Sequence, residues 1–410
     1  MIRQRLFGDL PREVFIVTAA AFSVAVGFGV LLPAIPIFAR TFGVNNAAIG
    51  LIVSMFAFTR FASGLISGKF VEKIGERFVF TAGVMMVAFF SVLVGLATSY
   101  HQLLFFRAAG GLGSSMFSVA ASSVILRSVS DEQRARAQSL YNGSFLLGGI
   151  AGPAIGGLLS LISLRAPFFT YALSLFIAGV IASVYLKNSE VLNRAKNSHE
   201  KVETFTVKMA WRFPAYRMAL AMAFIFAWVL FGLRASILPI FVVENLHSTT
   251  AMVGYGLTLS ALVQGSILLR AGRLSDQRGR RYVSRIGSSI VLIGVLPLAM
   301  TNHPWIYLLA MAVLGLGGAF LSTVPASVVG DIMTGKGGQV IGLFQMASDA
   351  GMIVGPLVVG YISDIISIRA AFFATAIVFL IALVISFRLP ETRNREEGPT
   401  QSADPSGVSS

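Results

Sequence analysis

The sequence predicts an all-α membrane protein in which twelve transmembrane helices form two pseudo-symmetric six-helix bundles. Three observations support this fold class. The chain of 410 residues is 55% hydrophobic and only 12% charged, whereas an average soluble protein is about 25% charged. Twelve stretches are apolar and long enough to cross a bilayer, which takes about 20 residues. Two sequence motifs also occur twice, at a nearly constant separation along the chain.

The composition excludes several classes of protein. The net charge of +14 would suit a nucleic-acid binder, but such proteins are not this apolar. The chain has no cysteine, which excludes a disulfide framework, a thiolate metal site and a cysteine nucleophile. Its four histidines are scattered, which argues against a histidine metal site. We therefore expect no metal, no cofactor, no nucleic-acid partner and no enzymatic activity.

The predicted spans follow one another along the chain, six in each half. The first follows Arg3 and Arg5, as a signal peptide would, but it is too long for the apolar core of a signal peptide and lacks a small-x-small cleavage site. In chain order, the expected spans are residues 14–38, 47–68, 78–98, 102–126, 137–162, 167–187, 215–240, 250–270, 283–300, 304–330, 338–362 and 367–388.

The basic residues orient these spans. Of the 32 Lys and Arg residues, 26 lie in the terminal segments or in the loops that join an even-numbered span to the next odd-numbered one. The opposite loops contain only Arg40, Arg165 and Arg369. Because positively charged loops remain in the cytoplasm, we expect both termini to be cytoplasmic and the protein to lie in the plasma (inner) membrane.

Two polar segments complete the predicted domain organisation. Residues 1–187 form the N-terminal bundle and residues 215–390 form the C-terminal bundle. Residues 188–214, rich in Lys, Glu, Asn and Ser, are expected to be a cytoplasmic linker. Residues 391–410 are polar and rich in Pro, Gly and Ser, so we expect a disordered cytoplasmic tail.

The duplicated motifs indicate an internal repeat. The first motif is expected in the cytoplasmic loops after spans two and eight, where Gly68 and Gly272 are 204 residues apart. The second is a Gly-x-x-x-Gly-Pro pattern within spans five and eleven, where Pro153 and Pro356 are 203 residues apart. Two motifs with this shared displacement imply a duplicated six-helix unit, which is how secondary transporters are built.

The residue types in both motifs suit helices that move against one another. Glycines let two backbones approach closely, an acid can accept from a helix N-terminus, and proline permits a bend. The first motif, which we call the gate motif, comprises Gly68, Glu72, Lys73, Gly75 and Arg77 in one copy and Gly272, Asp276, Gly279, Arg280 and Arg281 in the other. The second, the helix motif, comprises Gly148, Gly152, Pro153, Gly156 and Gly157 in span five and Gly351, Gly355 and Pro356 in span eleven.

On these residues the chain resembles the major facilitator superfamily over essentially residues 10–390. The gate motif is similar to the cytoplasmic signature Gly-x-x-x-Asp-Arg-x-Gly-Arg-Arg of that family, with Glu72 and Lys73 replacing Asp and Arg in the first copy. The span-five run resembles a motif of the twelve-span drug:proton antiporters. The resemblance also gives Arg107, in span four, the position of a family arginine that is linked to proton transfer or to stabilising the central cavity.

Charged residues inside spans are the main functional candidates, because a charge at the bilayer centre costs about 2.5–3.5 kcal/mol on insertion scales. Of the 18 acids, only Asp349 lies deep in a span, and Gln345 and Met352 share its helix face. We expect Asp349 to carry the transported proton or to bind a cationic substrate. The alternative is a permanent ion pair that fixes two helices.

The other polar candidates have less specific predicted roles. Arg60 is a candidate partner of Asp349 or an anion site, and Arg234 is expected to extend outward to lipid phosphate. Gln264 is expected to hydrogen bond to a neighbouring helix. Aromatic residues spaced to reach the centre of their spans are candidates for the cavity wall: Phe28, Phe56, Phe145, Phe226, Trp228 and Phe231.

Together these features predict a monomeric secondary transporter that binds a small-molecule substrate and protons and works by alternating access. The halves rock about a central cavity, the gate motif latches the outward-open state, and proton entry resets it. The span-five motif and the apolar walls favour multidrug-type efflux of small hydrophobic or cationic compounds. The alternatives are an importer or uniporter of a sugar, peptide or organic anion, and a non-transporting membrane receptor.

Overall fold

The computed structural model describes residues 10–129, 131–185, 206–333 and 338–392. Most of the predicted linker, residues 188–205, and most of the predicted tail, residues 393–410, lie outside the described residues. In the described part of the chain every regular element is a helix. Eleven helices are long and apolar enough to cross a membrane, or up to twelve when a bent pair counts as one span. This confirms the predicted all-helical membrane fold.

The described part of the N-terminal half contains seven helices. They are α2 (Arg12–Arg40), α3 (Asn46–Ala62), α4 (Gly64–Ile74), α5 (Glu76–Leu96), α6 (Tyr100–Ser128), α7 (Asp131–Ile162) and α8 (Ala166–Tyr185). The pair α3 and α4 forms the second span and bends by 45° at Ser63. There the Ser63 hydroxyl donates to the Thr59 carbonyl at 2.6 Å. Such back-bonding from a hydroxyl is a known cause of helix bending.

The C-terminal half repeats this order. Its elements are α10 (Val207–Trp211), α11 (Pro214–Ala227), the π-helical segment η3 (Trp228–Ile237), α12 (Leu238–Ile240), the π-helical segment η4 (Phe241–Asn245), α13 (Thr250–Arg278), α14 (Arg280–Met300), α15 (Pro304–Leu321), α16 (Val324–Ile332), α17 (Gly338–Ile365) and α18 (Ile368–Arg388). The seventh span runs from α11 through η4 and is largely π-helical beyond its midpoint, a geometry often found at functional sites.

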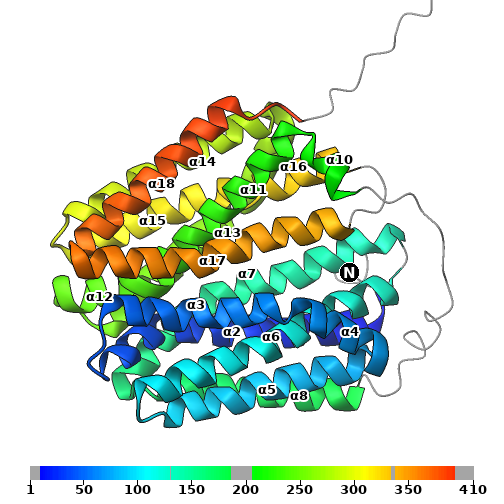
Figure 1. The fold of residues 1–410 in the computed structure, drawn as a ribbon, viewed down its shortest axis with the longest axis horizontal. Coiled ribbons are helices and arrows are strands. Elements are labelled where there is room, and N and C mark those ends of the chain that lie inside the picture. The colour runs from blue at the N-terminus through cyan, green and yellow to red at the C-terminus, as the bar shows by residue number, and fades with distance from the viewer. Residues whose placement is uncertain (1–9, 130, 186–205, 334–337, 393–410) are drawn as a thin grey trace, which may run out of the picture.

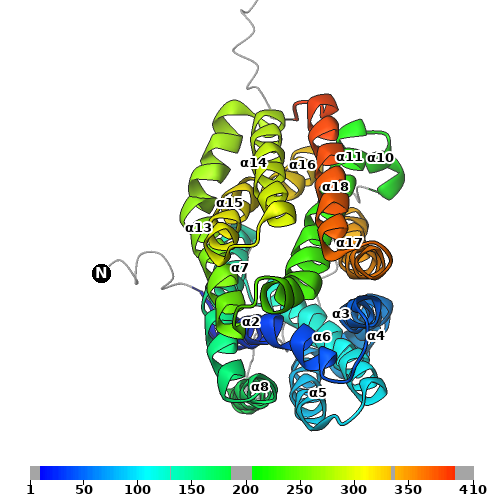
Figure 2. The ribbon, with the colours of Figure 1, turned by 90° about the vertical axis from the view of Figure 1, so that its left-hand side faces the viewer.

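Each half has its own hydrophobic core. Figure 1 shows the helices of the N-terminal half packed below those of the C-terminal half. The halves contact each other along two seams, α3 on α17 and α7 on α13. Figures 1 and 2 both show α17 beside α3. We call the end that carries residues 41–45 and 246–249 the closed end, and the end that carries residues 75 and 279 the basic end.

The two seams have the same construction. In one, a Cβ added to Gly50 of α3 would lie 2.2 Å from the Pro356 carbonyl oxygen of α17. In the other, a Cβ added to Gly254 of α13 would lie 2.4 Å from the Pro153 carbonyl oxygen of α7. Only glycine fits such an approach. The sequence displacement between the seams is that of the internal repeat, so the fold carries the predicted pseudo-symmetry into the interface.

At the basic end the halves separate. There α4 packs on α5 and α6, and α16 packs on α11 and α14, each within its own half. A Cβ added to Gly68 or Gly272 would meet no atom within 4 Å. Among the described residues, the halves therefore pack together at the closed end and are separate at the basic end.

The gate motif is mostly helical, which differs from the loops expected from the sequence. Gly68 to Lys73 belong to α4, and Gly272 to Arg278 belong to α13. Single residues, Gly75 and Gly279, join these helices to the next ones with φ of 98° and 97°. Because this left-handed region favours glycine, a one-residue turn is possible at both places.

Candidate substrate and proton site

Asp349 and Arg60, which belong to different halves, interact electrostatically. Asp349 lies on α17 and Arg60 on α3, and the charge of Arg60 acts on the Asp349 carboxylate. The two do not form an ion pair at 4.0 Å or less. Arg60 also interacts electrostatically with Tyr141 of α7. The structure thus brings together two residues that the sequence singled out, one from each half.

Gln345 lies on the same helix as Asp349, one turn nearer the basic end. Its side chain is exposed and that of Asp349 is partly exposed. On the basic-end side, Tyr141 stacks edge-to-face on Phe145, with ring centroids 5.3 Å apart. We call Asp349, Arg60, Gln345 and Tyr141 the polar level, which lies between the basic end and the apolar region described next.

The deeper region is a cluster of aromatic rings at the junction of the halves. Phe28 of α2 lies between Phe56 of α3 and Phe231 of η3, with centroid distances of 6.3 and 6.2 Å. Together with Met352 and Arg107, these rings line a cavity whose other lining residues are Leu32, Ile35, Val53 and Ala235. The cavity is about 10 Å³ in volume, enough for about one water molecule. We call it the base cavity.

Arg107 of α6 is the charged residue of the base cavity. It is 6% exposed, and its guanidinium lies 4.4 Å from the centroid of the Phe56 ring. Its Nε has no hydrogen-bond partner. A desolvated cation–π contact is worth about 2 kcal/mol, whereas burying a charge costs several kcal/mol. The contact with Phe56 therefore compensates only part of the cost of burial.

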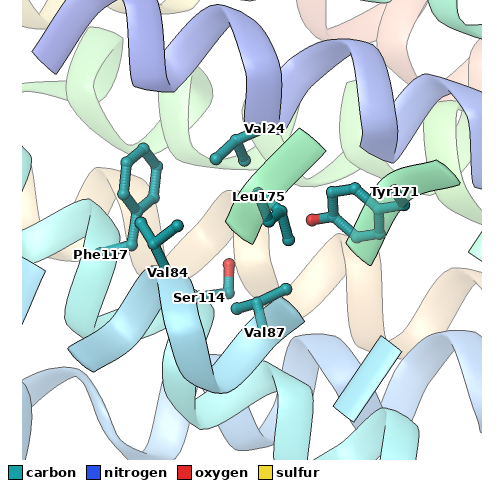
Figure 3. Close-up of a pocket in the computed structure, with 7 residues that line it drawn as sticks. All are labelled: Val24, Val84, Val87, Ser114, Phe117, Tyr171 and Leu175. Carbon is teal, nitrogen blue, oxygen red and sulfur yellow. The ribbon is translucent and has the colours of Figure 1, made fainter. Parts of the chain in front are cut away.

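The other group that interacts electrostatically with Arg107 is a neutral phenol, Tyr171 of α8. Tyr171 lines a second small cavity, inside the N-terminal half. Figure 3 shows its hydroxyl and that of Ser114 turned toward this space, among side chains from α2, α5, α6 and α8. The cavity is about 10 Å³ in volume. Among the described residues, Arg107 thus interacts electrostatically with a phenol, and no carboxylate lies within ion-pair distance of it.

The remaining polar candidates lie away from the base cavity. The sequence predicted that Arg234 extends outward to lipid phosphate, and this prediction is wrong. Its side chain is 9% exposed and donates to the Ser260 hydroxyl of α13. Gln264 lies against Gly318 of α15, where an added Cβ would be 3.2 Å from its Oε1. Both side chains therefore pack between helices of the C-terminal half.

Five of the six aromatic candidates divide into two groups, whereas Phe145 packs against Tyr141 and is not among the residues that line the base cavity. Phe28, Phe56 and Phe231 line the base cavity. Trp228 is 6% exposed and belongs to the core of the C-terminal half, and Phe226 packs against that core.

The helix motif packs mainly inside each half. A Cβ at Gly156 of α7 would lie 2.0 Å from the Val30 carbonyl oxygen of α2. In the repeat, a Cβ at Gly351 of α17 would lie 2.1 Å from the Phe224 carbonyl oxygen of α11. Gly157 instead faces α13 across the seam, with an added Cβ 3.0 Å from the Thr250 carbonyl oxygen. The motif therefore attaches the fifth and eleventh spans to the first and seventh.

The sequence analysis missed a polar network at the closed end. The Asp364 carboxylate of α17 accepts from the backbone N–H of Asn46 at 2.9 Å and of Ala47 at 2.7 Å, the first residues of α3. Arg40 forms an ion pair with Glu244 at 2.7 Å. Arg40 and Glu244 are 204 residues apart. This repeat displacement, at the end of the first span of each half, is the signal that could have identified them.

At the basic end the gate motif forms contacts within each half. Arg280 pairs with Asp276 at 2.5 Å and with Asp331 at 3.0 Å. In the first copy, Arg77 donates to the Ser183 carbonyl at 2.8 Å. These partners all belong to the same half as the arginine, so among the described residues the predicted latch between halves is not formed in this conformation.

Comparisons with known proteins agree with this architecture. The sequence matches the Major Facilitator Superfamily over residues 17–235 and 220–409. It is 24% identical to an uncharacterised MFS-type transporter of Methanocaldococcus jannaschii, over 93% of this chain and 98% of the relative. It is 22% identical to Multidrug resistance protein 2 of Bacillus subtilis, over 93% of this chain and 96% of the relative.

A solved structure shares the fold. A bacterial homologue of the human lysosomal transporter Spinster, in an inward-facing and occupied conformation, superposes with a TM-score of 0.77 and 17% identity. The match covers 92% of this chain and 96% of that one. With eleven or twelve candidate spans among the described residues, a small cavity between the two halves and a match to this family along nearly the whole chain, the protein belongs to the Major Facilitator Superfamily of membrane transporters and is not an enzyme.

Proposed function

We propose that this protein is a monomeric, proton-coupled exporter of small hydrophobic compounds that works by alternating access. The observation that carries the proposal is the electrostatic interaction of Asp349 on α17 with Arg60 on α3, which belong to different halves. Aromatic cavity walls support an apolar substrate. The full-length similarity to a relative named as a multidrug resistance protein supports export.

The proposed transport cycle starts from the conformation seen here. The protein lies in the plasma membrane with its basic end on the cytoplasmic side, as the distribution of Lys and Arg predicts. Substrate enters from that side and reaches the aromatic rings. The two seams then part, and the two copies of the gate motif close on each other. The protein is then open on the opposite face, where the substrate leaves.

Asp349 couples protons to this cycle because its charge decides whether Arg60 attracts α17. In the ionised state, the carboxylate and the guanidinium draw the two halves toward each other. Protonation from outside removes that attraction and returns the halves to the present conformation. At 100 mV, each proton contributes about 2.3 kcal/mol from the membrane potential, in addition to the pH difference.

The test is transport of the hydrophobic anionic dye 8-anilinonaphthalene-1-sulfonate in proteoliposomes with and without an imposed pH gradient. The wild type should accumulate the dye only with the gradient. Asp349→Asn should lose gradient-driven accumulation by more than about tenfold but keep downhill exchange, because the amide cannot release a proton. Glu13→Gln, which removes an acid near the start of α2, should behave as the wild type. Undiminished gradient-driven transport by Asp349→Asn would refute the proton role.

A further inference from the structure

The base cavity contains a buried cation without a matching anion. Arg107 is 6% exposed, and its Nε lies in the protein interior without a partner. Among the described residues no carboxylate lies within ion-pair distance of Arg107. The acid that lies deepest in a span, Asp349, has Arg60 as its electrostatic partner. Buried charges in proteins are normally paired, so the missing partner of Arg107 is expected to come from a ligand.

We propose that the base cavity binds the anionic head of an amphipathic substrate, so that the transported compounds are lipophilic organic anions such as aromatic monocarboxylates. This inference rests on the proposed transport function and narrows its substrate class. Arg107 receives the carboxylate, and Phe28, Phe56 and Phe231 hold the apolar body.

The geometry of Arg107 suits this role. A guanidinium offers parallel N–H donors in its plane, which match the two oxygens of a carboxylate. The ring of Phe56 covers the guanidinium at 4.4 Å. Stacking uses the face of the guanidinium and leaves its edge available to an acceptor. The Arg107 side chain is among those that line the cavity.

The polar level, which contains Arg60 and Asp349 and lies nearer the basic end than the base cavity, also suits an anionic ligand. Arg60 gives this region a positive charge in addition to the negative charge of Asp349, and Arg107 adds a second positive charge at the base cavity. The base cavity has room for about one water molecule. A carboxylate oxygen fits this volume, and in the proposed complex the body of the ligand lies against Phe28, Phe56 and Phe231. A cationic head there would meet the uncompensated charge of Arg107.

The experiment compares three probes with the same aromatic body and different charge. Equilibrium binding of 1-naphthaleneacetate, neutral 1-naphthaleneacetamide and cationic 1-naphthylethylammonium is measured by calorimetry on the full-length protein in detergent. The wild type should bind the acetate at least about tenfold more tightly than the amide, and the cation most weakly. Arg107→Gln should bind the acetate and the amide equally. Arg107→Lys should keep part of the preference, because the charge remains but the fork of donors is lost.

Arg165→Gln is the matched control, because Arg165 also lies near a phenylalanine, Phe38, in the N-terminal half but does not line the base cavity. It should keep the wild-type preference. Thermal unfolding in detergent identifies any variant that fails to fold, and the wild-type comparison stands without the variants. Equal affinity of the wild type for the acetate and the amide, absence of acetate binding, or an unchanged preference in folded Arg107→Gln would overturn the inference. Because binding is measured without a gradient, none of these outcomes depends on proton coupling.

Discussion

At the scale of single residues, Asp364 shows how one side chain can join the two halves. Its two carboxylate oxygens accept from the first two backbone N–H groups of α3, which belong to the other half. The first N–H groups of a helix have no partner within the helix, and a negative charge there is favoured by the helix dipole. Asp364 therefore caps a helix only while the closed end is shut.

Removing this cap should favour opening of the closed end. Losing an N-cap typically costs about 1 kcal/mol, or about a fivefold shift in population. Because the chain has no cysteine, a single cysteine in place of Leu32, which lines the base cavity, can report access. Labelling of this cysteine by an impermeant maleimide from the closed-end side should become about fivefold faster in Asp364→Ala.

Asp364→Asn is the graded control for this prediction. The amide keeps one acceptor oxygen and loses the charge, so the increase in labelling rate should be smaller than with alanine. If Asp364→Ala leaves the labelling rate unchanged, the cap does not hold the closed end shut.

Asp349 can be identified from the sequence as a functional candidate, but Asp364 cannot. Asp349 stands out because a charge in the middle of an apolar span is costly. Asp364 lies near the end of its span, where an acid is ordinary, and its role depends on a helix 317 residues away along the chain. Local sequence patterns do not reveal contacts between residues that are so far apart in the chain.

At the scale of helices, glycines decide where two backbones can meet in each conformation. The closed-end seam requires Gly50, since an added Cβ would lie 2.2 Å from a carbonyl oxygen. Gly68, at the basic end of the same span, has open space around its Cβ position. The two glycines of one span thus serve opposite conformations in the proposed cycle.

Substitutions of these glycines should therefore shift the equilibrium in opposite directions. Gly50→Leu cannot form the seam and should increase labelling of the Leu32→Cys reporter from the closed-end side. Gly68→Leu fits the present conformation but obstructs closure of the basic end, so labelling should stay at or below the wild-type level. Both variants should lose most of the transport activity.

A second glycine provides an internal check on this prediction. Gly254 repeats the geometry of Gly50 in the other seam, with a Cβ distance of 2.4 Å, so Gly254→Leu should resemble Gly50→Leu. Equal labelling in Gly50→Leu and Gly68→Leu would show that the seams do not control access.

At the scale of the whole molecule, orientation follows from charge, and access follows from how the halves meet. The 26 basic residues of the terminal segments and even-to-odd loops predict a cytoplasmic basic end. His303, before α15, and Lys208, in α10, are exposed residues at the closed and basic ends. Each is a suitable site for a single cysteine.

The orientation is tested in intact cells with an impermeant maleimide. The His303→Cys variant should be labelled directly, and the Lys208→Cys variant only after the membrane is permeabilised. The reverse labelling pattern would show that the protein has the opposite orientation in the membrane. The direction of transport in the proposed cycle would then also be reversed.

The sequence by itself determined the helical membrane fold, the repeat and the isolation of Asp349. These follow from local quantities: the apolar length of a span, the distribution of charge and the spacing of glycines. Only the tertiary structure decided which end is shut, that Asp349 interacts electrostatically with Arg60, and that Arg107 lacks an acid among the described residues. These depend on contacts between helices that lie far apart in the chain. The physical reason is that a buried charge is stabilised or left uncompensated by whatever packs beside it, and packing partners are set by the whole fold.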